Sequence, residues 1–262
     1  FVAQANGDIT IQASGDMAVG AQTSVEGLTK VTSASGNVEI ISNDKLSAGT
    51  SGAVDANILT ISKKSGNLEI ADLKDIAGNV NAVAFKADVI KTTNGSFGTQ
   101  AQPFMHDVAL TGDTDVALNL GNGYEVFVQS SPSFAKVSSD SDLKVGASNV
   151  ANASLKTSGN LELQDDFSAS GKIVFDVAGD VASTPDSVLN LNGGELELKV
   201  AGNASLPNVQ NVSKVTATGS GLKMAVMGNT MIGTASIAVN DLELKVAGDL
   251  TFESGSGDAI QA

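Results

Sequence analysis

Paired carboxylates are the side chains of this chain whose type and spacing come closest to reaction or metal chemistry. Residues i and i+2 of a strand project to one face, so Asp113 and Asp115 could bind calcium or act together as an acid and a base. Asp165 and Asp166 are adjacent in sequence. A solvated surface in an acidic chain accounts for both pairs more simply. We therefore expect no catalytic site, and calcium is the one cofactor that these four residues suggest.

Nucleophilic catalysis has little to build on in this sequence. The chain holds one histidine and no cysteine, and the Pro-Phe-Met-His-Asp context of His106 matches no triad motif. Tryptophan and arginine, which sugar sites use as platforms and clamps, are both absent. We therefore expect a non-enzymatic protein. A carbohydrate-active β-helix enzyme is the less favoured alternative.

Charge and hydropathy exclude two classes of partner. The chain has 29 acidic residues against 15 basic ones, all of them lysine, and a net charge of −14. Nucleic acids and anionic membranes are bound through clustered cations, so neither is an expected partner. No apolar run reaches the roughly 20 residues that span a bilayer. Because the chain begins at Phe1, we expect a processed mature protein or an excerpt of a longer one.

The elements that would position any site are short strands separated by glycine bends. Glycine followed by Asn or Asp occurs thirteen times, and most of these pairs precede an apolar–x–apolar triplet. Such alternation is typical of a strand with one buried face. Glycine accepts positive φ and the Asx side chain bonds to nearby backbone, so each pair predicts a tight bend.

The bends recur at a loose period of about 23 residues, in the range typical of repeat architectures. The heptapeptide LELKVAG occurs at 196–202 and again 46 residues later at 242–248, which we interpret as a separation of two coils. The chain is therefore predicted to be all-β, a parallel β-solenoid with coils of about 20–25 residues that forms a single rod over 1–262. The alternative is one or more antiparallel β-sandwiches with Gly-Asn and Gly-Asp hairpins.

The solenoid predicts which side chains of the triplets face the core. The leucines should be buried and the glutamates between them should be exposed. The leucines are Leu161, Leu163, Leu196, Leu198, Leu242 and Leu244, and the glutamates are Glu162, Glu197 and Glu243.

Residues 97–137 depart from the pattern. They contain the single histidine, the single tyrosine, two of the four prolines and half of the aromatic residues. One interpretation is an insertion or coil change with its own hydrophobic cluster. The other is a binding surface, because aromatic residues are enriched at the cores of interfaces. The candidate interaction residues here are Phe104, Tyr124, Phe127 and Phe134.

Three segments share the form Ser-Gly-Asn-apolar-Glu-apolar: SGNVEI at 35–40, SGNLEI at 65–70 and SGNLEL at 158–163. They resemble the repeats of filamentous-haemagglutinin-type proteins, which are long extracellular β-solenoids of bacterial surfaces. The resemblance implies an extracellular or cell-surface location and a structural or adhesive role, with no catalytic residues to carry over.

The function that these observations favour is a self-assembling structural subunit of a fibre, sheath or surface layer. A β-stack has open ends, and unpaired backbone groups there can template another chain. The predicted partner is therefore the chain itself, added end to end as a homopolymer. The residues expected at these contacts are Ile9, Ile11, Leu250 and Phe252. The alternative is a segment of an adhesin that binds a cell-surface ligand through 97–137.

Overall fold

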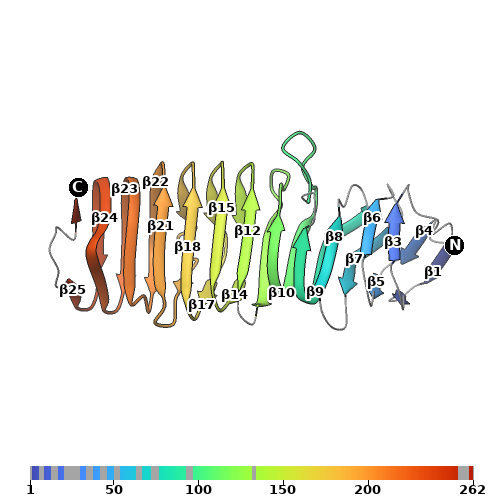
Figure 1. Cartoon of the computed structure of the whole chain (residues 1–262), viewed down its shortest axis with the longest axis horizontal. Helices are drawn as coiled ribbons and strands as arrows, with labels where there is room; N and C mark the ends of the chain where they lie inside the picture. Colours follow the sequence, from blue (N-terminus) through green and yellow to red (C-terminus); the bar gives the residue numbers. More distant parts are fainter. Residues whose placement is uncertain are drawn as a thin grey trace. The chain divides into compact units, whose positions relative to one another are not determined.

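The computed structural model describes residues 2–5, 9–12, 17–20, 30–33, 38–41, 46–49, 54–62, 67–71, 77–92, 97–131, 134–252 and 260–261. The described residues are all β and contain no helix (Figure 1). None of them therefore forms a helix long and apolar enough to cross a membrane.

The chain divides into two compact units, Phe1–Gln129 and Ser130–Ala262. The strands that begin in the first unit are β1 (Val2–Ala5), β2 (Ile9–Gln12), β3 (Met17–Gly20), β4 (Lys30–Ser33), β5 (Val38–Ile41), β6 (Leu46–Gly49), β7 (Val54–Ser62), β8 (Asn67–Ala71), β9 (Ala77–Thr92), β10 (Asp107–Ala117) and β11 (Val126–Ser131).

The second unit is built from shorter strands followed by two long ones. They are β12 (Ala135–Ser139), β13 (Leu143–Val145), β14 (Ser148–Val150), β15 (Ala153–Thr157), β16 (Leu161–Leu163), β17 (Phe167–Ala169), β18 (Lys172–Val177), β19 (Val181–Ser183), β20 (Leu189–Asn190), β21 (Glu195–Val200), β22 (Asn203–Gln210), β23 (Lys214–Met227), β24 (Thr230–Val246), β25 (Leu250–Phe252) and β26 (Ile260–Gln261).

Parallel pairing confirms the solenoid and excludes the antiparallel sandwich for the described strands. In the second unit β12, β15, β18 and β21 stack in sequence, each one coil beyond the last (Figure 1). The coils that lead from Ala153 to Ile173 and from Ile173 to Leu196 have the expected length. In the first unit the step from Ile9 to Val38 is longer than expected. The coil length therefore varies more than the spacing of the bends predicts.

Alternation of side chains explains why these segments form strands. In β15 and β21 alternate residues are buried, so one face of each strand lines the core. Parallel register stacks the inward residues of successive coils into columns. One column of the second unit runs through Leu161, Val181, Ala204 and Leu222, each at most 3% exposed. This column of the core is aliphatic throughout.

One core column of the first unit contains a buried hydroxyl. Thr114 pairs with Ile90, which pairs with Leu68, and all three are at most 1% exposed. The Thr114 Oγ1 atom has no hydrogen-bond partner. We expect Thr114→Val, which has nearly the same shape, to raise the free energy of unfolding by about 1 kcal/mol, because the variant no longer buries an unpaired hydroxyl. Urea unfolding measures this, and a destabilised variant would contradict it.

The positive φ expected for the glycines of the Gly–Asx pairs is found at some of them and not at others. Among the described pairs, φ is positive at Gly112 and Gly228, but not at Gly159, Gly179 or Gly202. At these three, a Cβ would collide with the side-chain oxygen of the Asx residue one coil earlier and with backbone there. Glycine is needed because two coils approach closely, so the assignment of a positive φ to these bends was wrong.

Asp142 and the Asx residues that follow these three glycines form a ladder across four coils. The Oδ1 atom of Asp142 accepts the N–H of Asn160 at 2.7 Å, and Asn160 accepts that of Asp180 at 2.8 Å. Asp180 in turn accepts the N–H of Asn203 at 2.7 Å. Each side chain thus satisfies a backbone donor of the next coil. Asp and Asn alternate, so neighbouring rungs do not both carry a negative charge.

The two copies of LELKVAG lie on different stacks of strands. Leu196 of the first copy pairs with Val215, whereas Leu242 of the second copy pairs with Leu222. The two positions therefore belong to separate columns, and the spacing of the copies is not two complete coils. The interpretation that the two copies are separated by two stacked coils was therefore wrong. The coils from Leu196 to Val215 and from Leu222 to Leu242 are each shorter than half of the 46 residues between the copies, so two such coils do not bring the second copy into register with the first.

The start of the 97–137 region is an excursion from a coil of the first unit. Phe97 bridges Leu118 and Phe104 bridges Leu120. Between them Thr99 and Gln102 exchange backbone hydrogen bonds at 2.9 and 3.2 Å, which closes a tight loop. Phe97 also stacks on Phe85 at 4.8 Å, and both are at most 1% exposed. This part has its own hydrophobic cluster, while the single rod over 1–262 stays a prediction.

Candidate functional site

An open layer of the β-stack is the candidate site, and β24 and β25 provide it. Leu242, Leu244 and Val246 are partly exposed. Their partners one coil back, Leu222, Met224 and Val226, are only 2%, 1% and 1% exposed. Leu250 and Phe252 are 37% and 54% exposed. We call Leu242, Leu244, Val246, Leu250 and Phe252 the terminal layer.

Within the described part of the chain, the backbone under the terminal layer is paired along one side only. The segment Asp241–Val246 of β24 pairs with β23 on one side. The later strands β25 and β26 pair with other parts of β24, at Thr230–Ile232 and Ile237–Ala238. Among the described residues no strand covers the far side of Asp241–Val246. Partly exposed apolar side chains therefore lie beside a strand edge that none of the described strands covers.

The burial expected from the sequence is confirmed for one copy of the repeat and wrong for the other. Leu196 and Leu198 are each 1% exposed, whereas Leu242 and Leu244 are partly exposed. The cause is position in the stack, since β23 covers the first copy and no described strand covers the second. Of the glutamates, Glu243 is exposed, but Glu162 and Glu197 are half-buried.

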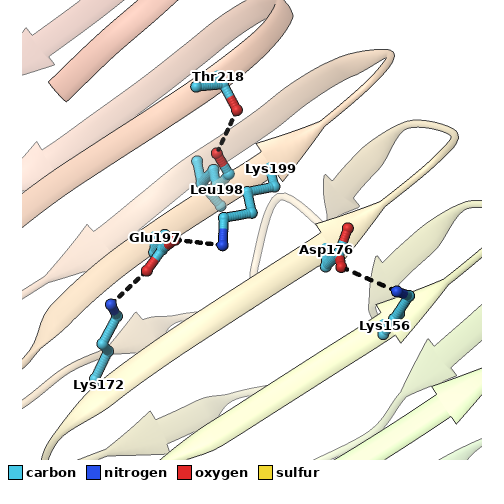
Figure 2. Close-up of polar contacts among 7 residues, drawn as sticks. All are labelled: Lys156, Lys172, Asp176, Glu197, Leu198, Lys199 and Thr218. Atoms are coloured by element: carbon cyan, nitrogen blue, oxygen red, sulfur yellow. Dashed lines mark hydrogen bonds and ion pairs between the residues drawn. The ribbon is translucent and has the colours of Figure 1, made fainter. Parts of the chain in front are cut away.

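Lysines flank the glutamate of each LELKVAG copy, which the sequence analysis missed. Glu197 pairs with Lys172 and, at 2.7 Å, with Lys199 (Figure 2). Glu243 pairs with Lys223 at 3.3 Å and Lys245 at 2.8 Å. The Glu-x-Lys spacing puts two of these partners on one face of a strand, and that spacing was the signal available in the sequence.

The ion pairs set the direction of the pKa of Glu197. Hydrogen bonds from Lys172 and Lys199 lower this pKa below its ordinary value of 4.5, and partial burial opposes them. Because the folded-state pKa is depressed, the pairs stabilise the fold above the unfolded value. Their contribution is lost as the pH falls through the lower, folded value.

We expect Glu197→Gln to lower the free energy of unfolding by up to about 1 kcal/mol at pH 7 and by less near pH 3, since the pairs are largely solvated. Urea unfolding across this pH range measures the effect. Glu162→Gln is the matched control, because Glu162 is also half-buried but makes no ion pair within the described part of the chain. Equal pH dependence of the wild type and Glu197→Gln would contradict the prediction.

A shallow groove of about 460 Å³ runs beside this charged row. Its wall is the outward row Ser138, Lys156, Asp176, Lys199 and Thr218, which register places on successive coils. Lys156 pairs with Asp176 at 3.4 Å, so the charges along the wall alternate and partly neutralise one another (Figure 2). The lining contains no aromatic platform. The groove offers hydroxyls and balanced charges without a specific ligand geometry.

The carboxylates suggested for calcium lie at two separate places. Asp113 and Asp115 lie on the same outward face of β10, as expected, and the buried Thr114 between them points to the other face. Asp115 is paired with Lys91 of β9. Asp165 and Asp166 are exposed in the bend after β16, where the Asp166 Oδ1 atom accepts the N–H of Val188 at 2.9 Å. No cluster of three or more His, Asp or Glu residues suited to a metal occurs among the described residues. Calcium binding stays a prediction.

The aromatic candidates differ in how far they reach the surface. Phe104 is 7% exposed and its ring lies 5.1 Å from that of His106. Tyr124 and Phe127 are half-buried, and Phe134 of the second unit is 40% exposed. A ligand surface here stays a prediction.

The strand candidates lie at opposite ends of the described chain. Leu250 and Phe252 belong to the terminal layer, together with leucines that the sequence assigned to the core. For Ile9 and Ile11 the structure describes the backbone, which pairs with Val38 and Ile40 of β5. Their side chains lie outside the described part.

Comparisons of the chain with family models, with curated proteins and with solved structures give no match.

Proposed function

We propose that the protein is a non-enzymatic structural subunit that assembles with copies of itself by adding strands to the end of its β-stack. The observation that supports this is the difference in burial between equivalent positions: Leu222 and Met224 are covered, whereas Leu242 and Leu244 are partly exposed. Covering apolar surface is the main favourable term in association, at roughly 25 cal/mol per Å². Pairing the edge of β24 that no described strand covers adds direction to that attraction.

The biological setting is a fibre, sheath or surface layer outside the cell. The resemblance of the Ser-Gly-Asn repeats to filamentous-haemagglutinin-type proteins supports this location. Net charge of −14 opposes association between copies, and salt screens that repulsion within about 10 Å at 0.1 M. Assembly is therefore stronger at higher ionic strength.

Sedimentation velocity at increasing protein concentration and salt tests the proposal. The wild-type chain forms species larger than a monomer, and Leu244→Asp stays monomeric because a charge enters the terminal layer. Asn240→Asp is the matched control, because Asn240 is exposed on the same strand and gains the same charge outside the terminal layer. A wild-type chain that is monomeric under all conditions, or equal behaviour of the two variants, refutes the proposal.

A further inference from the structure

The repeated heptapeptide provides an internal example of how a LELKV strand is covered. In the first copy the covering strand is the start of β23, with Leu196 opposite Val215, Glu197 opposite Thr216 and Leu198 opposite Ala217. The covering sequence is VTATGSG, at 215–221. It places uncharged Thr216 and Thr218 in register with the charged Glu197 and Lys199.

The second copy, Leu242–Val246, has the same side chains and no covering strand among the described residues. A suitable occupant would repeat the covering pattern, with apolar residues alternating with uncharged polar ones. The sequence ITIQASG at 9–15 has this form, and it shares Thr, Ser and Gly with VTATGSG at matching positions. Its first four residues are β2.

Like the Asp241–Val246 segment of β24, β2 pairs with a described strand along one of its two edges. Within the described residues the one registered pairing of β2 is with β5. The strands β1, β2 and β3 carry no charged residue and no proline, although charges and prolines are the usual protection of an exposed edge. Thr10 and Gln12 of β2 are neutral, so they can lie opposite Glu243 and Lys245 without repulsion between like charges. Asp8, the residue before β2 in the sequence, carries the same charge as Asp241 and does not extend the match in that direction.

We infer that the occupant of the β24 edge is β2 of a second copy, added in parallel with Leu242 opposite Ile9, Glu243 opposite Thr10, and Lys245 opposite Gln12. This inference rests on the proposed self-assembly and specifies its contact. The contact is heterologous, since it joins two different strands. Each added copy therefore presents a new β24 edge, and copies can continue to add head to tail.

Strand direction separates this contact from its main competitor. Every registered pairing between described strands is parallel, as in β21 with β23 and β23 with β24. Adding a second copy in the same orientation preserves that direction. If two copies instead joined their β24 edges through a two-fold axis, the two β24 strands would run in opposite directions. That pairing would be antiparallel.

The match to the covering strand ends after Gln12. Ala13 stands where β23 has Gly219, and a Cβ at Gly219 would collide with the carbonyl oxygen of Val200. The inferred register is therefore confined to the four pairs from Leu242 to Lys245.

Disulfide trapping tests the register, because the chain has no cysteine of its own. Paired residues of neighbouring strands lie about 4.8 Å apart, within the range of about 4.4–6.8 Å between Cα atoms that a disulfide allows. The first mixture combines Glu243→Cys with Thr10→Cys, and the second combines Lys245→Cys with Gln12→Cys. The control mixture, Asp241→Cys with Thr10→Cys, is two positions out of register.

Under mild oxidation we expect both in-register mixtures to give covalent dimers at least tenfold faster than the control, and each variant alone to give none. Non-reducing electrophoresis measures the rates. Fast dimerisation of Glu243→Cys alone overturns the inference in favour of a two-fold contact. Equal rates for all three mixtures overturn the register, as does a lack of trapping in variants that still assemble by sedimentation. Variants and wild type that never assemble overturn the proposed function as well.

Discussion

Replacing Leu198 by aspartate is expected to lower the free energy of unfolding by at least about 3 kcal/mol, because the variant places an unpaired charge in a close-packed core. Leu198 is 1% exposed and pairs with Phe175 on one side and Ala217 on the other. No water can reach a carboxylate there without opening the column. The variant therefore unfolds or binds a proton at that site.

The second copy of the repeat provides the control. Leu244 occupies the same place in LELKVAG, but it is partly exposed and lacks a covering strand among the described residues. We expect Leu244→Asp to cost about 1 kcal/mol or less. Urea unfolding of the two variants at low protein concentration, where copies do not associate, measures the difference. Equal losses would contradict the burial of one copy and the exposure of the other.

Gly202→Ala is expected to have the second largest effect, a loss of about 2–3 kcal/mol from overpacking. An added Cβ would lie 2.7 Å from the Gly179 carbonyl oxygen and would collide with the Asp180 Oδ1 atom. Both belong to the preceding coil, so relief requires that two coils move apart. The ladder bond from the Asn203 N–H to Asp180 is lost in that movement.

Gly193→Ala separates this steric cost from the conformational cost of replacing a glycine. Gly193 has φ of +89° and no atom within 4 Å of an added Cβ, so only the positive φ is penalised, at about 1 kcal/mol. Thermal unfolding of both variants provides the comparison. A Gly202→Ala variant as stable as Gly193→Ala would show that the coils are not in close contact at this corner.

The fold was predictable from the sequence because its two requirements are local. A Gly–Asx pair followed by an apolar–x–apolar triplet defines a strand and its inward face, as Leu161 and Leu163 show. Repetition then selects stacking over hairpins. The reason for each glycine was not predictable, because the atom that excludes a Cβ at Gly179 comes from Asn160 in the preceding coil.

The terminal layer was only half predictable. Leu250 and Phe252 could be proposed as contact residues because GDLTF at 248–252 has the form of a bend followed by a strand. Leu242 and Leu244 could not, because their sequence is identical to that of a buried segment. Their exposure depends on which strand covers them, and that depends on coil lengths that the spacing of the glycines does not give. The pairing of Glu197 with Lys172 likewise joins side chains of two coils.

The register between coils also determines how the second unit responds to mechanical force. Each coil contacts its neighbours in the stack, so a pull on the chain detaches one coil at a time. The segments from Ala153 to Ile173 and from Ile173 to Leu196 are two such coils. At about 3.3–3.6 Å for each extended residue, a detached coil of about 20–23 residues lengthens the chain by roughly 65–85 Å. Such a unit is a series of small extensible elements, which lengthens under load in steps of one coil.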